Sequence, residues 1–248
     1  MVRIGVVVFP GSNRDIDAFN ALHVAGAEPV GLWHESADLQ GVAAIILPGG
    51  FAYGDYLRAG AIARFSPVMR AVAGFAADGG LVLGICNGFQ VLAEAGLVPG
   101  ALLRNRSLRF VSRRIAIAPE RLDSPFTNLI PERRPLRMPV AHGEGCYYAD
   151  EATLDALERD GGVLFRYVHD DGTPVLDPDD PANPNGSLRA IAGVMNAAGN
   201  VAGLMPHPET AVEAVLGSED GLLIIRSLVE SAAARATAGG PVAVGGLR

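Results

Sequence analysis

The chain lacks lysine altogether, so all 20 basic residues among its 248 are arginine. The phosphate-binding loop of many nucleotide-binding proteins has the pattern Gly-x-x-x-x-Gly-Lys, and its lysine contacts phosphate. This chain therefore has no such loop. It also lacks any run of the roughly 18 apolar residues that a membrane-spanning helix needs. We expect neither ATP bound through a phosphate loop nor a membrane span.

Cysteine and positive charge are also scarce. Two cysteines are too few for a disulfide framework, which fits a reducing, cytoplasmic compartment. The net charge of −7 argues against a general nucleic-acid binder, because such proteins are usually basic. By contrast, 49% of the residues are hydrophobic, which is enough for a large core.

Apolar runs alternate with helical patterns in the first half of the chain. Strands are predicted at residues 2–9, 29–33, 43–47 and 81–85. Helices are predicted at residues 12–26, 66–77 and 88–95, with Ser12 and Ser66 as caps of the first two. This alternation predicts an α/β fold of three layers, αβα, with a mostly parallel open sheet.

Strand patterns dominate the second half. They occur at residues 109–118, 163–168, 188–194 and 201–205, and a loop dense in Asp, Pro and Asn covers residues 170–187. A helix is predicted at residues 218–234, and we expect the small-residue tail at 235–248 to be poorly ordered. No linker or internal repeat interrupts the pattern, so residues 1–234 are predicted to form one domain.

Cys86 is the candidate nucleophile. It lies in Gly84-Ile85-Cys86-Asn87-Gly88, where a predicted strand turns into a helix, and this is a cysteine version of the G-x-S-x-G nucleophile elbow. The glycines leave room for a strained turn, and the positive helix N-terminus favours a thiolate. A buried structural cysteine is the alternative that the pentapeptide alone leaves open. Cys146 has no such pattern around it and is predicted to be structural.

His207 is the candidate base among five histidines. It follows the predicted strand at 201–205, at the kind of strand end where doubly wound sheets place their chemistry. Prolines on both sides restrict the backbone there. Glu209, two residues later, can orient the imidazole ring. Taken by itself, Glu209 would be interpreted more simply as a residue of a first helical turn.

Backbone N–H groups are the candidates for an oxyanion site. The N–H of Asn87 follows the nucleophile, and the turn at Gly49 and Gly50 ends a neighbouring strand. The alternative is that these glycines only form a tight turn. Gln90 lies one turn past the elbow, where it can face a bound amino acid. The glycines around His142 and Gly143 would let the backbone approach a small ligand.

These motifs together resemble the class I (triad) glutamine amidotransferases. The family pattern is a glycine loop, a G-x-C-x-G-x-Q elbow and a distal H-P-E, matched here by Pro48-Gly49-Gly50, Gly84–Gln90 and His207-Pro208-Glu209. The resemblance implies a flavodoxin-like fold and hydrolysis of glutamine through a thioester on Cys86. It also implies that His207 and Glu209 complete the triad, with Gly49, Gly50, Asn87, Gln90, His142 and Gly143 around the substrate.

Further segments resemble the glutaminase subunits of one synthase in purine biosynthesis. They are residues 8–13, 49–58, 84–90, 141–145 and 183–187. The resemblance implies two partners, a large ATP-dependent synthase subunit that uses the ammonia and a small accessory subunit. It places ATP and Mg²⁺ on the synthase and no cofactor or metal on this chain. Four positions depart from typical members, which have Cys, Cys, Cys and Arg where this chain has Arg14, Ala59, Ser112 and Thr210.

Two charged segments have more than one interpretation, and three other functions also fit the sequence. The arginines at 104–114 fit either a contact with phosphate or an acidic partner, or a solvated strand face. The acidic loop at 170–187 invites a metal hypothesis, but its spacing lacks an EF-hand pattern. The rival functions are a glutaminase for another synthase, a cysteine hydrolase or peptidase on the same fold, and a regulatory subunit with a dead site.

Overall fold

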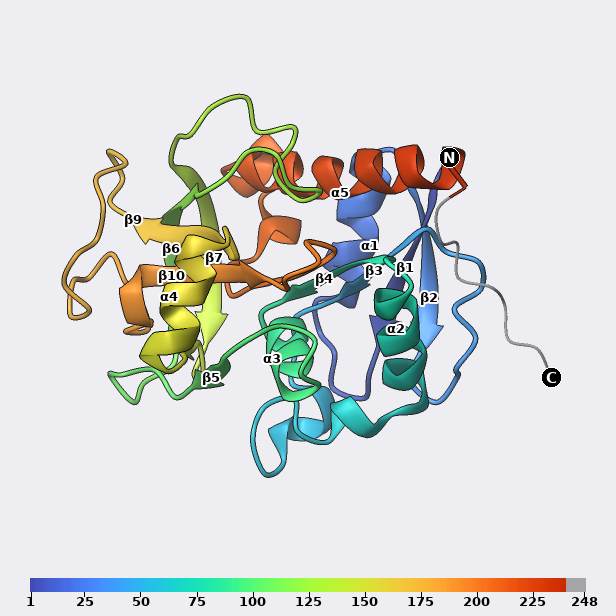
Figure 1. Cartoon of the computed structure of the whole chain (residues 1–248), viewed down its shortest axis with the longest axis horizontal. Helices are drawn as coiled ribbons and strands as arrows, with labels where there is room; N and C mark the ends of the chain where they lie inside the picture. The colour runs from blue at the N-terminus through green and yellow to red at the C-terminus, as the bar shows by residue number, and fades with distance from the viewer. Residues whose placement is uncertain (240–248) are drawn as a thin grey trace.

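The computed structural model describes residues 1–239 (Figure 1). Its large sheet contains β1 (Arg3–Val8), β2 (Glu28–Trp33), β3 (Ala44–Leu47), β4 (Leu81–Ile85), β6 (Val111–Pro119), β7 (Leu136–His142), β9 (Val163–Val168), β10 (Ile191–Met195) and β11 (Val201–Leu204). A small separate sheet pairs β5 (Ala101–Leu103) with β8 (Cys146–Tyr148). The helices are α1 (Asp15–Val24), α2 (Pro67–Ala77), α3 (Asn87–Glu94), α4 (Glu151–Arg159) and α5 (Asp220–Thr237).

The large sheet has two halves of different character. Its strand order is β2-β1-β3-β4-β11-β10-β9-β6-β7. From β2 to β11 all neighbouring strands run parallel, and we call this the parallel half. From β10 to β7 each strand runs antiparallel to its neighbour, and we call this the antiparallel half. Every residue of β3, β4 and β11 is buried, as expected for parallel strands covered on both faces.

Helices cover the two faces of the parallel half. Helices α1 and α5 contact each other and lie on one face, whereas α2 and α3 lie on the other (Figure 1). The resulting three-layer α/β fold confirms the predicted fold class. Within residues 1–239, no helix combines the length and apolar character that crossing a bilayer requires.

Most predicted elements are present, and the errors have local causes. Strands β4 and β9 have the predicted bounds, but residues 188–190 form a short 3₁₀ turn before β10. Ser12 does not cap α1, which begins at Asp15, because its hydroxyl accepts a hydrogen bond from the N–H of Phe9 at 3.2 Å. Helix α4 and strands β5 and β8 were not predicted. Strands β5 and β8 are short and depend on pairing with each other.

The end of the chain is only partly described. Helix α5 continues to Thr237, past the expected domain end at 234. Arg235, expected to open a loose tail, instead donates a hydrogen bond to the Gly79 carbonyl at 2.6 Å. The rest of the expected tail, residues 240–248, lies outside the described residues.

Sheet order brings three predicted site segments together. Strands β3, β4 and β11 are direct neighbours in the parallel half, and Gly49, Cys86 and His207 follow their carboxyl ends. Strand β7 is last in the sheet order, yet its Pro139 carbonyl accepts a hydrogen bond from the N–H of His207 at 2.9 Å. The antiparallel half therefore bends back toward the same site.

Candidate active site

Cys86 adopts the strained turn that the elbow pattern predicts. Its φ of 49° and ψ of −104° place it in a region that residues with a side chain rarely occupy, directly between β4 and α3. A Cβ on Gly88 would overlap the carbonyl oxygen of Leu47, and one on Gly84 would lie 2.7 Å from the backbone of Gly88. Both glycines are therefore required by close backbone packing. The N–H of Cys86 donates to the Leu204 carbonyl at 2.8 Å, which ties the elbow to β11.

His207 and Glu209 form a buried pair beside the elbow. The distance from His207 Nδ1 to Glu209 Oε1 is 2.6 Å, and both side chains are almost fully buried. Burial alone lowers the pKa of His207, but the charges of Glu209 and Cys86, together with hydrogen bonding to both, raise it to about 10. The positively charged imidazole is therefore the form of His207 that this environment favours.

The other ring nitrogen of His207, Nε2, is the one left to interact with Cys86. Nε2 has no hydrogen bond of ordinary geometry within residues 1–239, although the interaction with Cys86 contributes to the raised pKa. The Cys86 sulfur lies 3.7 Å from the Ala141 carbonyl oxygen. A Cβ on Gly49 would lie 2.8 Å from the His207 ring. Glycine at position 49 therefore also makes room for the base.

The segment from Gly50 to Leu57 is a strained loop over the elbow. A Cβ on Gly50 would lie 2.7 Å from the Cα of Ser12, so this turn also needs a glycine. Tyr53, Asp55 and Leu57 all have positive φ although none is a glycine, with values of 55°, 53° and 71°. Such strain persists only where surrounding contacts hold it.

The Asn87 side chain supplies some of those contacts. Its Oδ1 accepts from the N–H of Ala52 at 2.9 Å, and its Nδ2 donates to Asp55 at 3.2 Å and to Gln90 Oε1 at 2.9 Å. Gln90 Nε2 in turn donates to the Glu144 carbonyl at 2.6 Å. Both ends of the Gln90 amide are thus engaged within the protein. These hydrogen bonds support a structural role for Gln90, which holds Asn87 and the Glu144 segment together. The sequence had instead predicted a contact with the substrate.

Asp55 has an altered acidity in this loop. Burial, followed by the charge of Glu144, raises its pKa to about 6, and the hydrogen bond from Asn87 opposes that rise. Asp55 was not singled out in the sequence, because an acidic residue in a loop ordinarily faces solvent.

His142 and Gly143 lie at the end of β7. His142 is buried, and its pKa is lowered to about 4 by burial and by the positive charge of His207. The Gly143 carbonyl accepts from the N–H of Asn105 at 2.9 Å. The segment is therefore next to the triad, as expected, but its imidazole is neutral and is held by other side chains.

Three buried polar residues near the site were missed. Asn105 and Asn185 hydrogen-bond to His142, and Tyr167 accepts from Asn185 at 3.0 Å. Burial raises the pKa of Tyr167, and the hydrogen bond from Asn185 opposes that rise. Asn185 belongs to a segment that carried the family resemblance, but no local pattern indicated what its side chain contacts.

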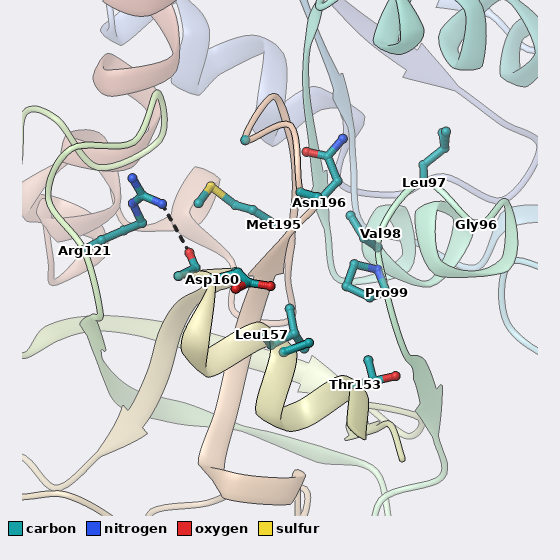
Figure 2. Close-up of a pocket in the computed structure, with 15 residues that line it drawn as sticks. Gly96, Leu97, Val98, Pro99, Arg121, Thr153, Leu157, Asp160, Met195 and Asn196 are labelled. Atoms are coloured by element: carbon teal, nitrogen blue, oxygen red, sulfur yellow. Dashed lines mark hydrogen bonds between the residues drawn. The ribbon is translucent and has the colours of Figure 1, made fainter. Parts of the chain in front are cut away.

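Figure 2 shows a pocket of about 610 Å³ that contains none of the triad residues in its lining. Leu157 of α4, Met195 at the end of β10 and Asn196 in the turn before β11 line it. Since His207 follows the opposite end of β11, the pocket and the triad lie at opposite ends of that strand. Residues 1–239 contain no group of three or more His, Cys, Asp or Glu side chains arranged to hold a metal ion.

Comparison with known proteins agrees with this geometry. Residues 1–220 match the family model of the CobB/CobQ-like glutamine amidotransferase domain. The phosphoribosylformylglycinamidine synthase subunit PurQ of Salinibacter ruber is 57% identical over 228 residues, which cover 92% of this chain and 95% of that protein. Its counterpart in Rubrobacter xylanophilus is 56% identical over 231 residues, covering 93% and 99%. A chain in the structure of PurLQS from Thermotoga maritima has a TM-score of 0.79 at 43% identity, covering 92% and 98%.

Proposed function

Because the chain belongs to the PurQ family of phosphoribosylformylglycinamidine synthase subunits, we propose that Cys86, His207 and Glu209 are the residues through which it hydrolyses glutamine. It is the glutamine amidotransferase subunit of that synthase in purine biosynthesis, and its partner is the large synthase subunit. The observation that carries the residue assignment is the convergence of the strained Cys86 and the buried His207–Glu209 pair at the ends of adjacent strands.

The chemistry takes two steps. The Cys86 thiolate attacks the side-chain amide carbon of glutamine and forms a C–S bond. His207 gives a proton to the amide nitrogen, the C–N bond breaks and ammonia leaves. Water, deprotonated by His207, then attacks the thioester, and cleavage of the C–S bond releases glutamate and restores the thiolate beside the protonated His207.

Charge in the tetrahedral intermediates needs its own stabilisation. The N–H of Asn87 lies in the first turn of α3, where a helix has no intrahelical acceptor for it, and the Gly49–Gly50 turn follows the neighbouring strand. These backbone donors are assigned to the oxyanion. Glu209 holds the imidazole tautomer and stabilises its charged form without bonding to substrate.

The remaining parts of the reaction belong to partners. We place ATP and Mg²⁺ on the large synthase subunit, since this chain has no lysine with which to complete a phosphate loop. Ammonia released at Cys86 is the nitrogen source for that subunit, and a small accessory subunit completes the complex. The compartment we assign is the cytoplasm, where Cys86 stays reduced.

Covalent labelling tests the nucleophile. A glutamine-analogue electrophile such as 6-diazo-5-oxo-norleucine should modify Cys86 and spare Cys146, whose pKa is raised by burial. Modification of Cys146 with Cys86 untouched would overturn the assignment.

Ammonia rescue tests the division of labour. In the complete complex, Cys86→Ala should abolish glutamine-dependent synthesis, while added ammonium salt should restore product. Loss of the ammonia-dependent reaction in a correctly assembled complex would contradict a synthase site on a separate chain.

A further inference from the structure

We propose that His142 is a positioning residue: as a neutral imidazole with its proton on Nδ1, it braces the Ala141–Gly145 segment against the nucleophile. The inference rests on the proposed role of Cys86 and adds a residue that makes no bond to the substrate. Its support is a chain of buried hydrogen bonds in which backbone groups fix the orientation of the two asparagine amides on either side of the ring.

Asn105 sets the first link. Its Nδ2 donates to the carbonyls of His142 and Arg109, at 2.8 Å and 2.9 Å. Its Oδ1 therefore faces the other way and accepts from the N–H of Gly145 at 2.9 Å. His142 Nδ1 lies 3.1 Å from the same oxygen and must be the donor, so this nitrogen carries a proton.

Asn185 sets the second link. Its Oδ1 accepts from both the N–H and the hydroxyl of Ser187, at 3.1 Å and 2.7 Å. Its Nδ2 therefore points to Tyr167 and to His142 Nε2, at 3.0 Å and 3.4 Å. Nε2 faces a donor and has to accept, so it carries no proton. A second proton, on Nε2, would place two hydrogen-bond donors, Nε2–H and the Asn185 N–H₂, against each other.

The electrostatic environment of His142 also favours its neutral form. Burial and the positive charge of His207 lower the pKa of His142 to about 4. Among the described residues, His207 is the ionisable neighbour whose charge acts on this ring. His207 therefore remains the single cationic imidazole beside the sulfur, and His142 stays neutral at physiological pH.

The braced segment touches the nucleophile and the elbow helix. The Ala141 carbonyl oxygen lies 3.7 Å from the Cys86 sulfur, and the Glu144 carbonyl accepts a hydrogen bond from Gln90. The His142 ring also packs directly on Gly145, where a Cβ would lie 2.6 Å from ring atoms. The His142 ring thus braces a short segment whose Ala141 and Glu144 carbonyls contact Cys86 and Gln90 of α3.

Histidine NMR of the full chain tests the tautomer. With ¹⁵N-labelled histidine, the His142 signals, assigned by their loss in His142→Phe, should show a protonated Nδ1 and an unprotonated Nε2. They should not change between about pH 5.5 and 8, since the pKa lies near 4. A proton on Nε2, or titration near the ordinary histidine value, would overturn the proposal without any variant having to fold.

Kinetics in the complete complex test the positioning. His142→Phe keeps a ring of similar size but removes both hydrogen bonds, and the glutaminase kcat should fall about 10²-fold with a smaller change in KM, because small displacements at a reacting centre are costly. Alkylation of Cys86 by iodoacetamide, which needs no substrate alignment, should change by less than about 3-fold. The exposed His23, changed to Phe, is the matched control and should behave as wild type.

The outcomes separate the two proposals. If the Cys86→Ala variant kept the glutaminase activity of the wild type, the proposed function itself would be rejected. Cys86-dependent wild-type activity together with an unchanged kcat in His142→Phe would reject only the role of His142. Equal losses in kcat and in iodoacetamide reactivity would indicate general disruption of the site and would also reject positioning.

Discussion

The two halves of the sheet hold the residues of the proposed site in different ways. The parallel half presents Gly49, Cys86 and His207 on short turns at adjacent strand ends, where glycines and strained backbone angles set the geometry. The antiparallel half presents Ala141 and His142, and their geometry depends on side chains far away in the sequence. Local backbone determines the first set, and a buried polar network determines the second.

The two kinds of site should therefore tolerate amino-acid substitutions differently. An added Cβ that overlaps main-chain atoms must displace the backbone, because no side-chain rearrangement can relieve the clash. A hydrogen-bond network can lose one member and relax, at the cost of leaving a partner unsatisfied. Substitutions that force backbone overlap should therefore have larger effects than those that remove one side chain from a hydrogen-bond network.

Gly88→Ala should have the largest effect. Its Cβ would overlap the carbonyl oxygen of Leu47, so the elbow must move and glutaminase activity should be lost. We expect destabilisation of at least about 2 kcal/mol by urea unfolding. Gly74→Ala, in α2 with nothing near the added Cβ, is the control and should stabilise the fold by about 0.5–1 kcal/mol. Normal turnover in Gly88→Ala would contradict the requirement for glycine.

His207→Ala should come next. His207 both accepts and delivers protons, so its loss should reduce glutaminase nearly as far as Cys86→Ala does. Steady-state glutaminase rates in the complete complex measure this, with folding checked by circular dichroism. Wild-type turnover in the variant would mean that another group is the base.

Glu209→Gln should cost less, about 10–10³-fold in turnover. The amide can keep a hydrogen bond to Nδ1 at the position of the 2.6 Å contact but favours the wrong tautomer and loses the negative charge. It should also lower the pKa of His207, since the Glu209 charge is the largest influence that raises it. A variant as inactive as Cys86→Ala would show that orientation is not the whole role of Glu209.

Asn87→Ala should have an intermediate effect that the sequence did not indicate. From sequence, only its backbone N–H was assigned a role, and that survives substitution. The structure adds a side chain that holds the strained loop, and its loss leaves the buried N–H of Ala52 without an acceptor. We expect about 10-fold lower turnover. Arg58→Ala, which removes an exposed ion pair with Glu94, is the control and should change turnover little.

His142→Phe should have the smallest effect on stability at neutral pH and a distinct effect in acid. The folded-state pKa of about 4 lies below the ordinary histidine value, so the unfolded chain takes up a proton first as pH falls. The stability contribution is complete above about pH 6.5 and is lost toward pH 4, by up to about 1.4 kcal/mol per pH unit. Asp55, with its raised pKa, has the opposite slope in this window. Urea unfolding of both proteins at several pH values should therefore show a shallower acid decline in the variant, and parallel curves would contradict a neutral buried His142.

The sequence by itself determined the parallel half and the residues of the proposed triad. Unbroken apolar runs indicate strands buried on both faces, and glycine patterns mark turns where only a missing Cβ will fit. Such signals are local, so β4, the Cys86 elbow and the His207–Glu209 pair could all be predicted. Even the departure at Thr210 is accommodated locally, since its hydroxyl donates to the His207 carbonyl at 3.1 Å.

Only the tertiary structure decided how the other half reaches the site. The return of β7 to His207, the bracing of the strained loop by Asn87, and the network of Asn105, His142 and Asn185 join residues many positions apart. An asparagine in a sequence indicates a turn or an exposed position as readily as a buried hydrogen-bond partner. Which donor meets which acceptor is set by packing of the whole sheet, and that is why the proton on His142 could be assigned from the fold but not from the sequence.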